Sequence, residues 1–256
     1  MGFHLSFTRR PQRVPSGPLA AVPQRCATKS GHTADVFALD EDRVVRRYRN
    51  GEDATGEAVV MAYLAEHGYP VPAVWPGAAA GELVMQRLSG PAMREALVAG
   101  TLSSEQAGGL LAGLLMRLHA IPPPPPGGGA DPAHRIVHLD LHPENVLLTT
   151  DGPVVIDWAT AQEGPPGLDT AMAALILAQA ALTMPAAADI ARAVLPALLR
   201  QLGGTDGMLL AEARARRATN PTLTQVEIAA LDEAVALILT TCPAVASPSR
   251  TRQPTR

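Results

Sequence analysis

The sequence predicts an α+β fold in two lobes, a small one of strands and one helix over residues 30–88 and a larger, mainly helical one over residues 89–242. Three observations carry this prediction. Short β-branched runs bounded by turn residues occupy the first part, and apolar residues recur at helical spacing through most of the second. Between residues 136 and 161, two strand-like runs flank a polar loop that holds two aspartates and an asparagine.

The small lobe begins with a predicted hairpin over residues 30–37 and 42–46, because an acidic turn joins two short alternating segments. A helix is expected over residues 53–67, where Asp53 can cap the start and Gly68 stops the end. A strand over residues 82–88 follows, and Ser89-Gly90-Pro91 breaks it. Two strands, a helix and a third strand therefore make up the expected small lobe.

The large lobe begins with a helical pattern from Ala92, in which Ser103 and Gln106 form a predicted capping box. A leucine stripe at residues 110–118 gives that helix a buried face, and Pro122 ends it. Helices are then predicted over residues 170–182, 186–202 with a kink at Pro196, 207–218, and 224–240. Residues 1–29 and 243–256 lack any period and are expected to be a disordered basic arm and a disordered tail.

Composition excludes several classes of protein. Hydrophobic residues make up 47% of the chain and aromatic residues only 3%, so the core must be built from Ala, Leu and Val. Cys26 and Cys242 lie too far apart for a disulfide framework or a metal motif, which favours a cytoplasmic protein. The longest apolar run, residues 171–182, contains Gln179 and is too short for a membrane span, and no signal peptide is evident.

Charge argues against a nucleic-acid partner. The net charge is −3, but residues 1–34 and 243–256 carry bases and no acids, so the middle of the chain is strongly acidic. An acidic surface repels phosphate backbones. We expect a small-molecule substrate, and the sequence indicates neither a nucleic-acid, a membrane nor a protein partner.

The stretch HLDLHPENVLL at residues 138–148, with VIDW at residues 155–158, carries the chemistry. Its spacing matches the template H-x-D-x-x-x-x-N followed by a metal-binding aspartate. In phosphoryl transfer one aspartate orients the acceptor hydroxyl and takes its proton, a role that falls to Asp140. Asn145 and Asp157 would be the Mg²⁺ ligands. The alternative, that these acids sit in a polar loop for capping alone, requires a chance match at five positions.

These residues resemble the aminoglycoside phosphotransferase and choline kinase branch of the protein-kinase-like superfamily. The resemblance spans about residues 31–182 and implies a two-lobed protein-kinase-like fold with ATP, or another nucleoside triphosphate, and Mg²⁺ in the cleft. It implies transfer of phosphate to a hydroxyl of a small molecule. Ordinary protein kinases have lysine where this chain has His142, and phenylalanine where it has Trp158.

The resemblance also assigns supporting roles. His138 is expected to brace the catalytic loop more than to move protons, and His142 is expected to approach the γ-phosphate. Asp169 would brace the loop through backbone hydrogen bonds, or cap the following helix. Gln86 to Leu88 would form the hinge that reads the nucleotide base, with Met85 behind it.

The phosphate-binding side departs from the family pattern. Gly31 is the only glycine left in the first hairpin, so a glycine-rich loop is absent. Lys29 is the only lysine and precedes the hairpin, so the cation that grips phosphate is best aligned to Arg46. Glu57 on the first helix would pair with it. The alternatives are that Arg46 is a strand-face charge and that Glu57 simply favours a helix N-terminus.

Residues 89–242 hold fifteen acids and eight bases, which mildly favours an amine-bearing acceptor such as an aminoglycoside. The alternative places the acids on solvated helix faces, and it concerns Asp189, Asp206, Glu212, Asp232 and Glu233. Two rival functions stay open. A nucleotide-binding pseudokinase would explain the missing lysine and glycine loop, and a protein kinase would share the template. Against the second, residues 157–169 leave little room for an activation segment.

Overall fold

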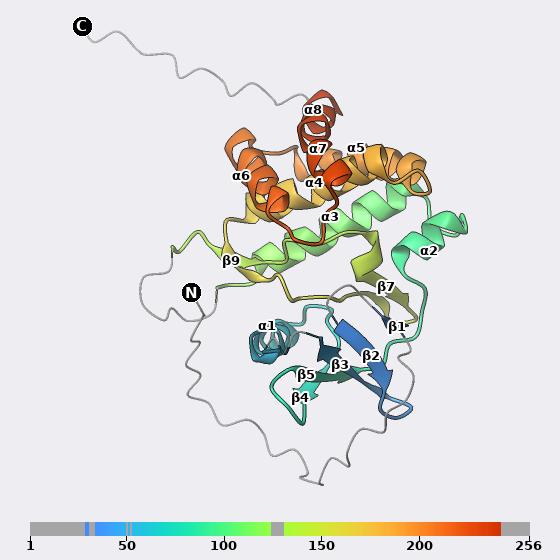
Figure 1. The fold of residues 1–256 in the computed structure, drawn as a ribbon, viewed down its shortest axis with the longest axis vertical. Coiled ribbons are helices and arrows are strands. Elements are labelled where there is room, and N and C mark those ends of the chain that lie inside the picture. Colours follow the sequence, from blue (N-terminus) through green and yellow to red (C-terminus); the bar gives the residue numbers. More distant parts are fainter. Residues whose placement is uncertain (1–28, 31–33, 50, 52, 124–130, 242–256) are drawn as a thin grey trace, which may run out of the picture.

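The structure is a computed structural model and describes residues 29–30, 34–49, 51, 53–123 and 131–241. Within these residues a small antiparallel sheet with one helix lies below a larger layer of helices (Figure 1). We call residues 29–88 the N-lobe and residues 89–241 the C-lobe. Gly31, most of the predicted basic arm and the predicted tail lie outside the described residues, so the expectations for them stay predictions.

The N-lobe sheet has five antiparallel strands in the order β1-β2-β3-β5-β4. Val45 and Arg46 of β3 point to opposite faces of the sheet and are both buried, whereas Arg47, on the face opposite to Arg46, is exposed. The strands are β1 (Lys29–Ser30), β2 (Ala34–Ala38), β3 (Arg43–Tyr48), β4 (Val74–Pro76) and β5 (Glu82–Gln86).

Helix α1 (Thr55–Glu66) lies where the sequence predicts it. The carboxylate of Asp53 accepts the backbone N–H of Thr55 at 2.8 Å, which satisfies a donor at the start of the helix. Gly68 has φ +71°, a left-handed conformation that glycine adopts without strain, and the helix ends just before it. The helix carries Glu57 into the space between the lobes.

The C-lobe is built from stacked helices. They are α2 (Met93–Val98), α3 (Ser104–Ala120), α4 (Pro166–Thr183), α5 (Ala188–Leu202), α6 (Gly207–Ala218), α7 (Gln225–Ala229) and α8 (Leu231–Thr241). The predicted capping box is present at α3, where Ser103 and Gln106 exchange hydrogen bonds of 2.9 and 3.2 Å. Gly108 lets α3 approach α5, because a Cβ there would lie 2.5 Å from Cβ of Ala197.

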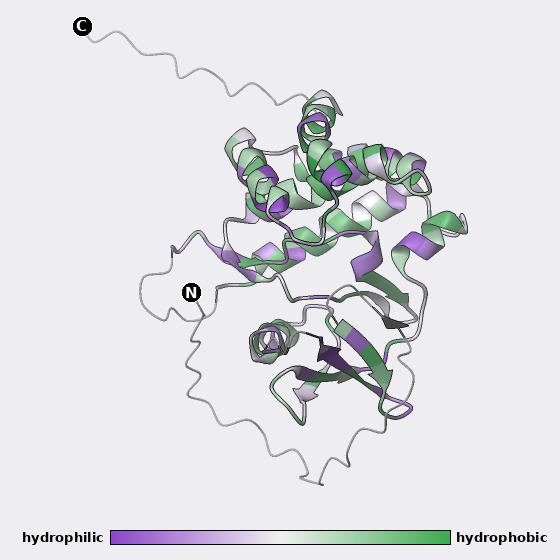
Figure 2. Cartoon of the chain, viewed as in Figure 1, coloured by the Kyte–Doolittle hydropathy of each residue, from purple (hydrophilic) through white to green (hydrophobic). Residues whose placement is uncertain are grey.

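Helix α4 runs through the centre of the C-lobe, and Figure 2 colours most of the α3–α5 layer hydrophobic. Its 18 residues are long and apolar enough to cross a membrane by length and composition, but 67% of that window is buried inside the protein. The 18 residues of the helix are five more than those of the helix predicted over residues 170–182, because it begins at Pro166 and ends at Thr183. Its place is that of a core helix.

Two predictions about the C-lobe helices are wrong. The single helix expected over residues 224–240 is divided into α7 and α8, because α7 buries none of its residues whereas α8 turns to bury Leu231, Ala234 and Ile238. Asp169 does not cap α4, whose N-cap is Pro165. It lies inside the first turn, fully buried, and its carboxylate points to the catalytic loop instead.

Two small antiparallel pairs hold the segments that carry the predicted chemistry. The pairs join β6 (Arg135–Val137) to β9 (Gln162–Gly164), and β7 (Val146–Thr149) to β8 (Gly152–Val155). The loop that contains Asp140, which we call the catalytic loop, follows β6 and ends in the short 3₁₀ helix η1 (Pro143–Asn145). Asp157 comes two residues after β8. Strand β6 therefore positions the loop that holds Asp140, and strand β8 positions Asp157.

Candidate active site

The catalytic loop is anchored by the carboxylate of Asp169. It accepts the backbone N–H of His138 at 2.8 Å and of Leu139 at 2.7 Å. His119, at the end of α3, lies 3.1 Å from the same carboxylate. A buried carboxylate requires such donors, because desolvation of an unpaired charge is costly. The first turn of α4 therefore fixes the backbone just before Asp140.

His138 is fully buried, and both of its ring nitrogens are engaged. Nε2 lies 3.1 Å from the carbonyl oxygen of Ile156 and donates to it, whereas Nδ1 accepts the backbone N–H of Asp140 at 3.2 Å. The ring also packs 4.5 Å from that of Trp158, centroid to centroid. Neither nitrogen is left to exchange a proton with a substrate, so His138 is a positioning residue that joins the loop to the end of β8.

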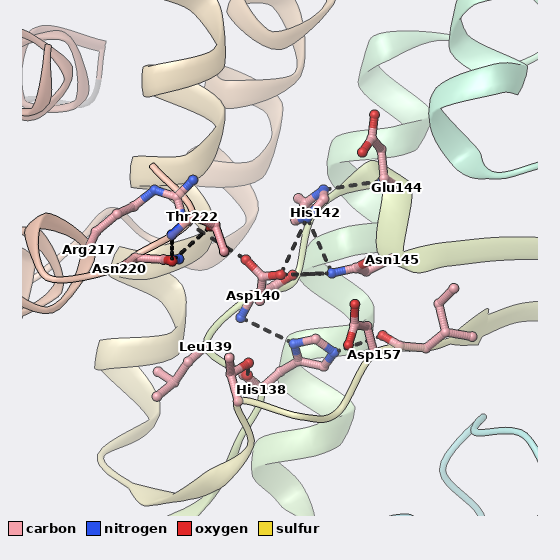
Figure 3. A network of polar contacts seen from close by, with 12 residues as sticks. His138, Leu139, Asp140, His142, Glu144, Asn145, Asp157, Arg217, Asn220 and Thr222 are labelled. Carbon is pink, nitrogen blue, oxygen red and sulfur yellow. Dashed lines mark hydrogen bonds and ion pairs between the residues drawn. The ribbon is translucent and has the colours of Figure 1, made fainter. Parts of the chain in front are cut away.

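Asp140 lies next to Asn145 and His142 (Figure 3). The side-chain amide of Asn145 donates to the carbonyl oxygen of Asp140 at 2.8 Å and to its Oδ2 at 3.1 Å. Nε2 of His142 lies 3.7 Å from the same Oδ2, and its Nδ1 accepts the backbone N–H of Glu144 at 3.3 Å. His142 therefore caps η1 and faces Asp140.

The electrostatic surroundings favour the ionised form of Asp140. Burial raises the pKa of its carboxyl, but the hydrogen bond and charge of His142 and the charge of Arg217 outweigh that cost and hold the pKa below its usual value. About a third of the side chain is exposed, so the carboxylate is open to a ligand. An ionised, accessible carboxylate is what an acceptor hydroxyl needs for orientation.

Asp157 has a left-handed backbone, with φ +67°. Left-handed geometry is unfavourable for a non-glycine residue and tends to persist at functional sites that over-determine it. The neighbouring Ile156 is held on both sides, since its N–H donates to the carbonyl oxygen of Asn145 at 3.0 Å and its carbonyl accepts from His138. The side chain of Asp157 is 42% exposed, which leaves carboxylate oxygen accessible.

Arg46 connects the lobes. Its Nη1 donates to Oε1 of Glu57 at 2.9 Å, and its Nη2 donates to Oδ1 of Asp157 at 2.7 Å. The pair that the resemblance implied between Arg46 and Glu57 is thus present, and the strand-face alternative for Arg46 is wrong because the side chain is buried. Burial lowers the pKa of the guanidinium, but Glu57 and Asp157 outweigh this effect and raise it above its usual value.

Glu57 is a junction of three donors. Besides Arg46, its carboxylate accepts the hydroxyl of Tyr48 and the backbone N–H of Trp158, the latter at 3.1 Å. Helix α1, strand β3 and the segment after β8 therefore meet at one buried carboxylate. The dipole of the helix N-terminus alone does not explain this position, because every one of these contacts lies outside α1.

Two of the three backbone N–H groups in the predicted hinge, residues 86–88, already donate hydrogen bonds within the protein. The N–H of Gln86 donates to the carbonyl oxygen of Ala73 at 2.8 Å, and the N–H of Arg87 donates to that of Asp42 at 2.7 Å. Neither is free to bind a base. In the described part of the chain the N–H of Leu88 makes no hydrogen bond, so base binding by Leu88 stays a prediction. Gly31 lies outside the described residues.

Sequence reasoning missed Arg217 on α6. Its Nη1 lies 4.0 Å from Oδ1 of Asp140, and its Nε donates to Oε1 of Gln179 at 2.5 Å. Two signals point to this pair. Arg217 follows the buried Leu210 and Ala213 at helical spacing, and Gln179 is the only amide within the apolar run of α4.

The fold and the site define a class. A small antiparallel sheet on a larger helical lobe, with the loop that holds Asp140 and the candidate metal ligand Asp157 between them, is the arrangement of protein-kinase-like phosphotransferases. A family model described as "Phosphotransferase enzyme family" matches residues 26–135 and 124–205, which is more than half of the chain. The chain belongs to this family, whose reaction is phosphoryl transfer to an alcohol group.

Solved structures agree with this fold. A choline/ethanolamine kinase family protein from Mesorhizobium loti is 17% identical, with a TM-score of 0.50 over 89% of this chain and 93% of that one. The streptomycin–ATP complex of APH(2″)-IIa is 15% identical, with a TM-score of 0.51 over 82% and 84%. A thermostable mutant of the aminoglycoside phosphotransferase APH(4)-Ia, with AMP-PNP and hygromycin B, is 13% identical, with a TM-score of 0.52 over 86% and 94%.

No curated protein matches the sequence. At these identities the solved structures show the fold alone. They confirm the predicted two-lobed protein-kinase-like class.

Proposed function

We propose that this enzyme transfers the γ-phosphoryl group of ATP to a hydroxyl of a small molecule. The observation that carries the proposal is the joint placement of Asp140, Asn145 and Asp157. The side-chain amide nitrogen of Asn145 donates to the Asp140 carboxylate, and its main-chain carbonyl oxygen accepts the N–H of Ile156, the residue before Asp157. In phosphoryl transfer the protein contributes positioning and charge more than covalent chemistry, and this group supplies both.

Asp140 would receive the acceptor hydroxyl. Its lowered pKa keeps it ionised at neutral pH, so it accepts the hydrogen bond of the hydroxyl, aligns the oxygen with the phosphorus and takes the proton as the bond forms. His142, 3.7 Å from Oδ2, stands beside the path of the transferred group. The loop keeps this geometry because Asp169 and His138 fix its backbone on both sides.

Asn145 and Asp157 would hold Mg²⁺. The amide nitrogen of Asn145 faces Asp140, which leaves its oxygen for a cation, and the Asp157 carboxylate is partly exposed. Amide and carboxylate oxygens are the ligands that this hard cation prefers, so the donor set fits. When bound, Mg²⁺ neutralises charge on the phosphate oxygens.

Arg46 would bind phosphate oxygens in place of a lysine. Its guanidinium is buried and oriented by Glu57, and its other contact, Asp157, would share it with the nucleotide. A planar fork of donors suits phosphate oxygens. The Leu88 N–H would donate to an acceptor atom of the base of ATP or of another nucleoside triphosphate. The widely separated cysteines support the cytoplasm as the compartment.

The five acids of the solvated-face alternative lie at the surface, as that alternative expects. Asp206 caps α6 through the N–H groups of Met208 and Leu209, and the others lie on exposed helix faces, so they give no support to an amine-bearing acceptor. An acid excess on solvated surfaces does not focus cations in a cleft. The acceptor must be argued from the cavity beside Asp140 instead.

A turnover assay tests the function. Purified protein with ATP and Mg²⁺ is screened against aminoglycosides, macrolides, amino alcohols and sugars, and phosphorylated product is measured by mass spectrometry. We expect transfer to at least one acceptor, and a loss of about 100-fold or more in Asp140→Ala with nucleotide binding retained. Asp151→Ala, in the exposed turn between β7 and β8, is the matched control. Undiminished transfer by Asp140→Ala would sink the assignment.

The same assay addresses the two rivals. A pseudokinase binds nucleotide with no transfer to any acceptor, which a thermal-shift measurement with and without Mg²⁺ separates from inactivity through misfolding. A protein kinase would label a generic protein acceptor. Against it, the segment after Asp157 forms β9 and enters α4 directly.

A further inference from the structure

A cavity of about 140 Å³ lies beside the catalytic loop. Residues of α4 and α5 line it, and it reaches the catalytic loop at His142. Most of the lining is apolar, from Ile176, Leu177, Ala180, Met184, Ile190 and Ala191. Sugars and polyamines need many polar partners when they are buried, whereas this lining suits an apolar body.

Arg217 supplies the polar end of the cavity. It lies 4.0 Å from Oδ1 of Asp140, and Figure 3 shows its guanidinium turned toward that carboxylate. The side chain is only 13% exposed. Within the described residues its Nη1 and Nη2 donate no hydrogen bond, and Nη1 has only the long ion pair with Asp140, so both nitrogens can donate to a ligand. A ligand oxygen would satisfy them.

Gln179 fixes the direction in which Arg217 points. The amide is 2% exposed and uses both of its ends, because Oε1 accepts from Nε of Arg217 at 2.5 Å and Nε2 donates to the carbonyl oxygen of Glu227 at 2.8 Å. A buried amide in an otherwise apolar helix is unfavourable unless its hydrogen bonds are made. Gln179 therefore holds the guanidinium of Arg217 in one orientation.

A second arginine borders the same cavity from α2. Nε of Arg94 lies 3.2 Å from Oε1 of Glu144, but the contact is not aligned as a hydrogen bond. Among the described residues this buried nitrogen has no hydrogen-bond partner. Arg94 of α2 and Arg217 of α6 thus both line the cavity, and each has side-chain nitrogens that donate no hydrogen bond within the described residues.

The acids at the cavity are already engaged. Glu144 pairs with Arg94, and the Glu227 carboxylate caps α7 by accepting from the N–H and hydroxyl of Thr224 at 2.8 and 2.7 Å. Asp140 is reserved for the acceptor hydroxyl. An amine in this cavity would compete with Arg94 for Glu144 and with Arg217 for Asp140, and like-charge repulsion from the two guanidinium groups would oppose it.

We propose that this cavity is the acceptor site and that Arg217 selects an acceptor with an apolar body and an anionic or carbonyl oxygen near the hydroxyl to be phosphorylated. The inference rests on the proposed function and specifies its substrate class. Arg217 grips the oxygen, the apolar residues of α4 and α5 enclose the body, and the hydroxyl is left facing Asp140. Polycationic acceptors are rejected by the same arginine.

Three matched probes test the selection by binding, independently of turnover. They are cyclohexylmethanols that carry a carboxylate, a carboxamide or an aminomethyl group at C4. Binding to the full chain with AMP-PNP and Mg²⁺ is measured by ligand-observed NMR for the wild type, Arg217→Gln and Arg217→Lys. Arg216→Gln is the matched control, because Arg216 lies on the same helix but pairs with Glu212 on the exposed face.

We expect the wild type to bind the carboxylate probe at least tenfold more tightly than the amine. That ratio should fall to about one in Arg217→Gln, stay partly in Arg217→Lys, which keeps the charge, and be unchanged in Arg216→Gln. A purely structural role would weaken the three probes equally and leave the ratio intact. Tighter binding of the amine, no binding of any probe, or an unchanged ratio in Arg217→Gln would each overturn the inference. Failure of the proposed function shows separately, as absent phosphoryl transfer.

Discussion

Arg46 on β3 and Asp157 after β8 are 111 positions apart in the chain and form an ion pair of 2.7 Å. Within the described residues, Arg46 is the only buried cation of the N-lobe sheet. Asp157 is one of the two candidate metal ligands. With the proposed roles, we expect the pair to couple phosphate binding to metal binding, because a nucleotide that draws on Arg46 would also free an oxygen of Asp157.

Arg46→Met should weaken nucleotide binding by about tenfold or more, since it removes a charge-assisted contact to phosphate. It should also lower the free energy of unfolding by roughly 3 kcal/mol, because it breaks a buried ion pair and leaves Glu57 without its cation. Isothermal titration with AMP-PNP and urea unfolding measure the two effects. Arg47→Met is the control on the opposite face, where Arg47 pairs with Glu82 at the surface. Equal losses in the two variants would contradict the assignment.

Asp157→Ala should abolish the Mg²⁺-dependent part of nucleotide binding, because a hard cation needs an anionic oxygen. Titrations with and without Mg²⁺ give the difference between the two affinities, which should vanish in the variant. Asp151→Ala belongs to the same hairpin and should keep the wild-type difference. If metal dependence survives in Asp157→Ala, the cation binds elsewhere.

Asp169→Ala should reduce transfer by at least about tenfold and lower the free energy of unfolding by roughly 2–4 kcal/mol. It leaves two buried N–H groups, those of His138 and Leu139, without an acceptor. Thermal and urea unfolding measure the stability, and single-turnover transfer measures the rate. An enzyme of wild-type rate and stability would show that the loop holds itself without this carboxylate.

His142→Gln should raise the pKa of Asp140, because His142 is the largest of the influences that lower it. Since a lowered carboxyl pKa keeps the ionised form at acid pH, the wild-type acid limb of kcat/KM from Asp140 should lie below the ordinary carboxyl range, and the variant's limb should move to higher pH. For stability the sign is the same. The contribution of Asp140 is present above its unfolded pKa and is lost as pH falls through the lowered folded value. Coincident pH profiles of wild type and variant would refute this link.

The sequence predicted the parts of the site that depend on local spacing. Asp140, Asn145 and Asp157 lie within 18 residues of one another, so a template can place them before any fold is known. The pairing of Arg46 with Glu57 was expected from the family resemblance alone, and the structure contains it.

The rest depended on contacts between distant segments. Arg217 meets Gln179 only when α6 packs on α4, and no spacing in the sequence brings those helices together. The N–H of Gln86 is unavailable for a base because it donates to the carbonyl oxygen of Ala73, and that contact likewise depends on how β4 approaches β5. Net charge could not identify the acceptor for the same reason, since a count of acids does not tell which of them face solvent.

The position of Trp158 gives the protein a built-in spectroscopic reporter. Its indole is 1% exposed, stands edge-on to the ring of Tyr69 at 5.6 Å between centroids, and its backbone N–H is held by Glu57 of the N-lobe. The chain has one other tryptophan, Trp75 on β4, so a Trp75→Phe variant would emit from the lobe junction alone. Fluorescence and amide exchange at this one residue would then follow the lobes opening and closing around a nucleotide in real time, without any attached dye.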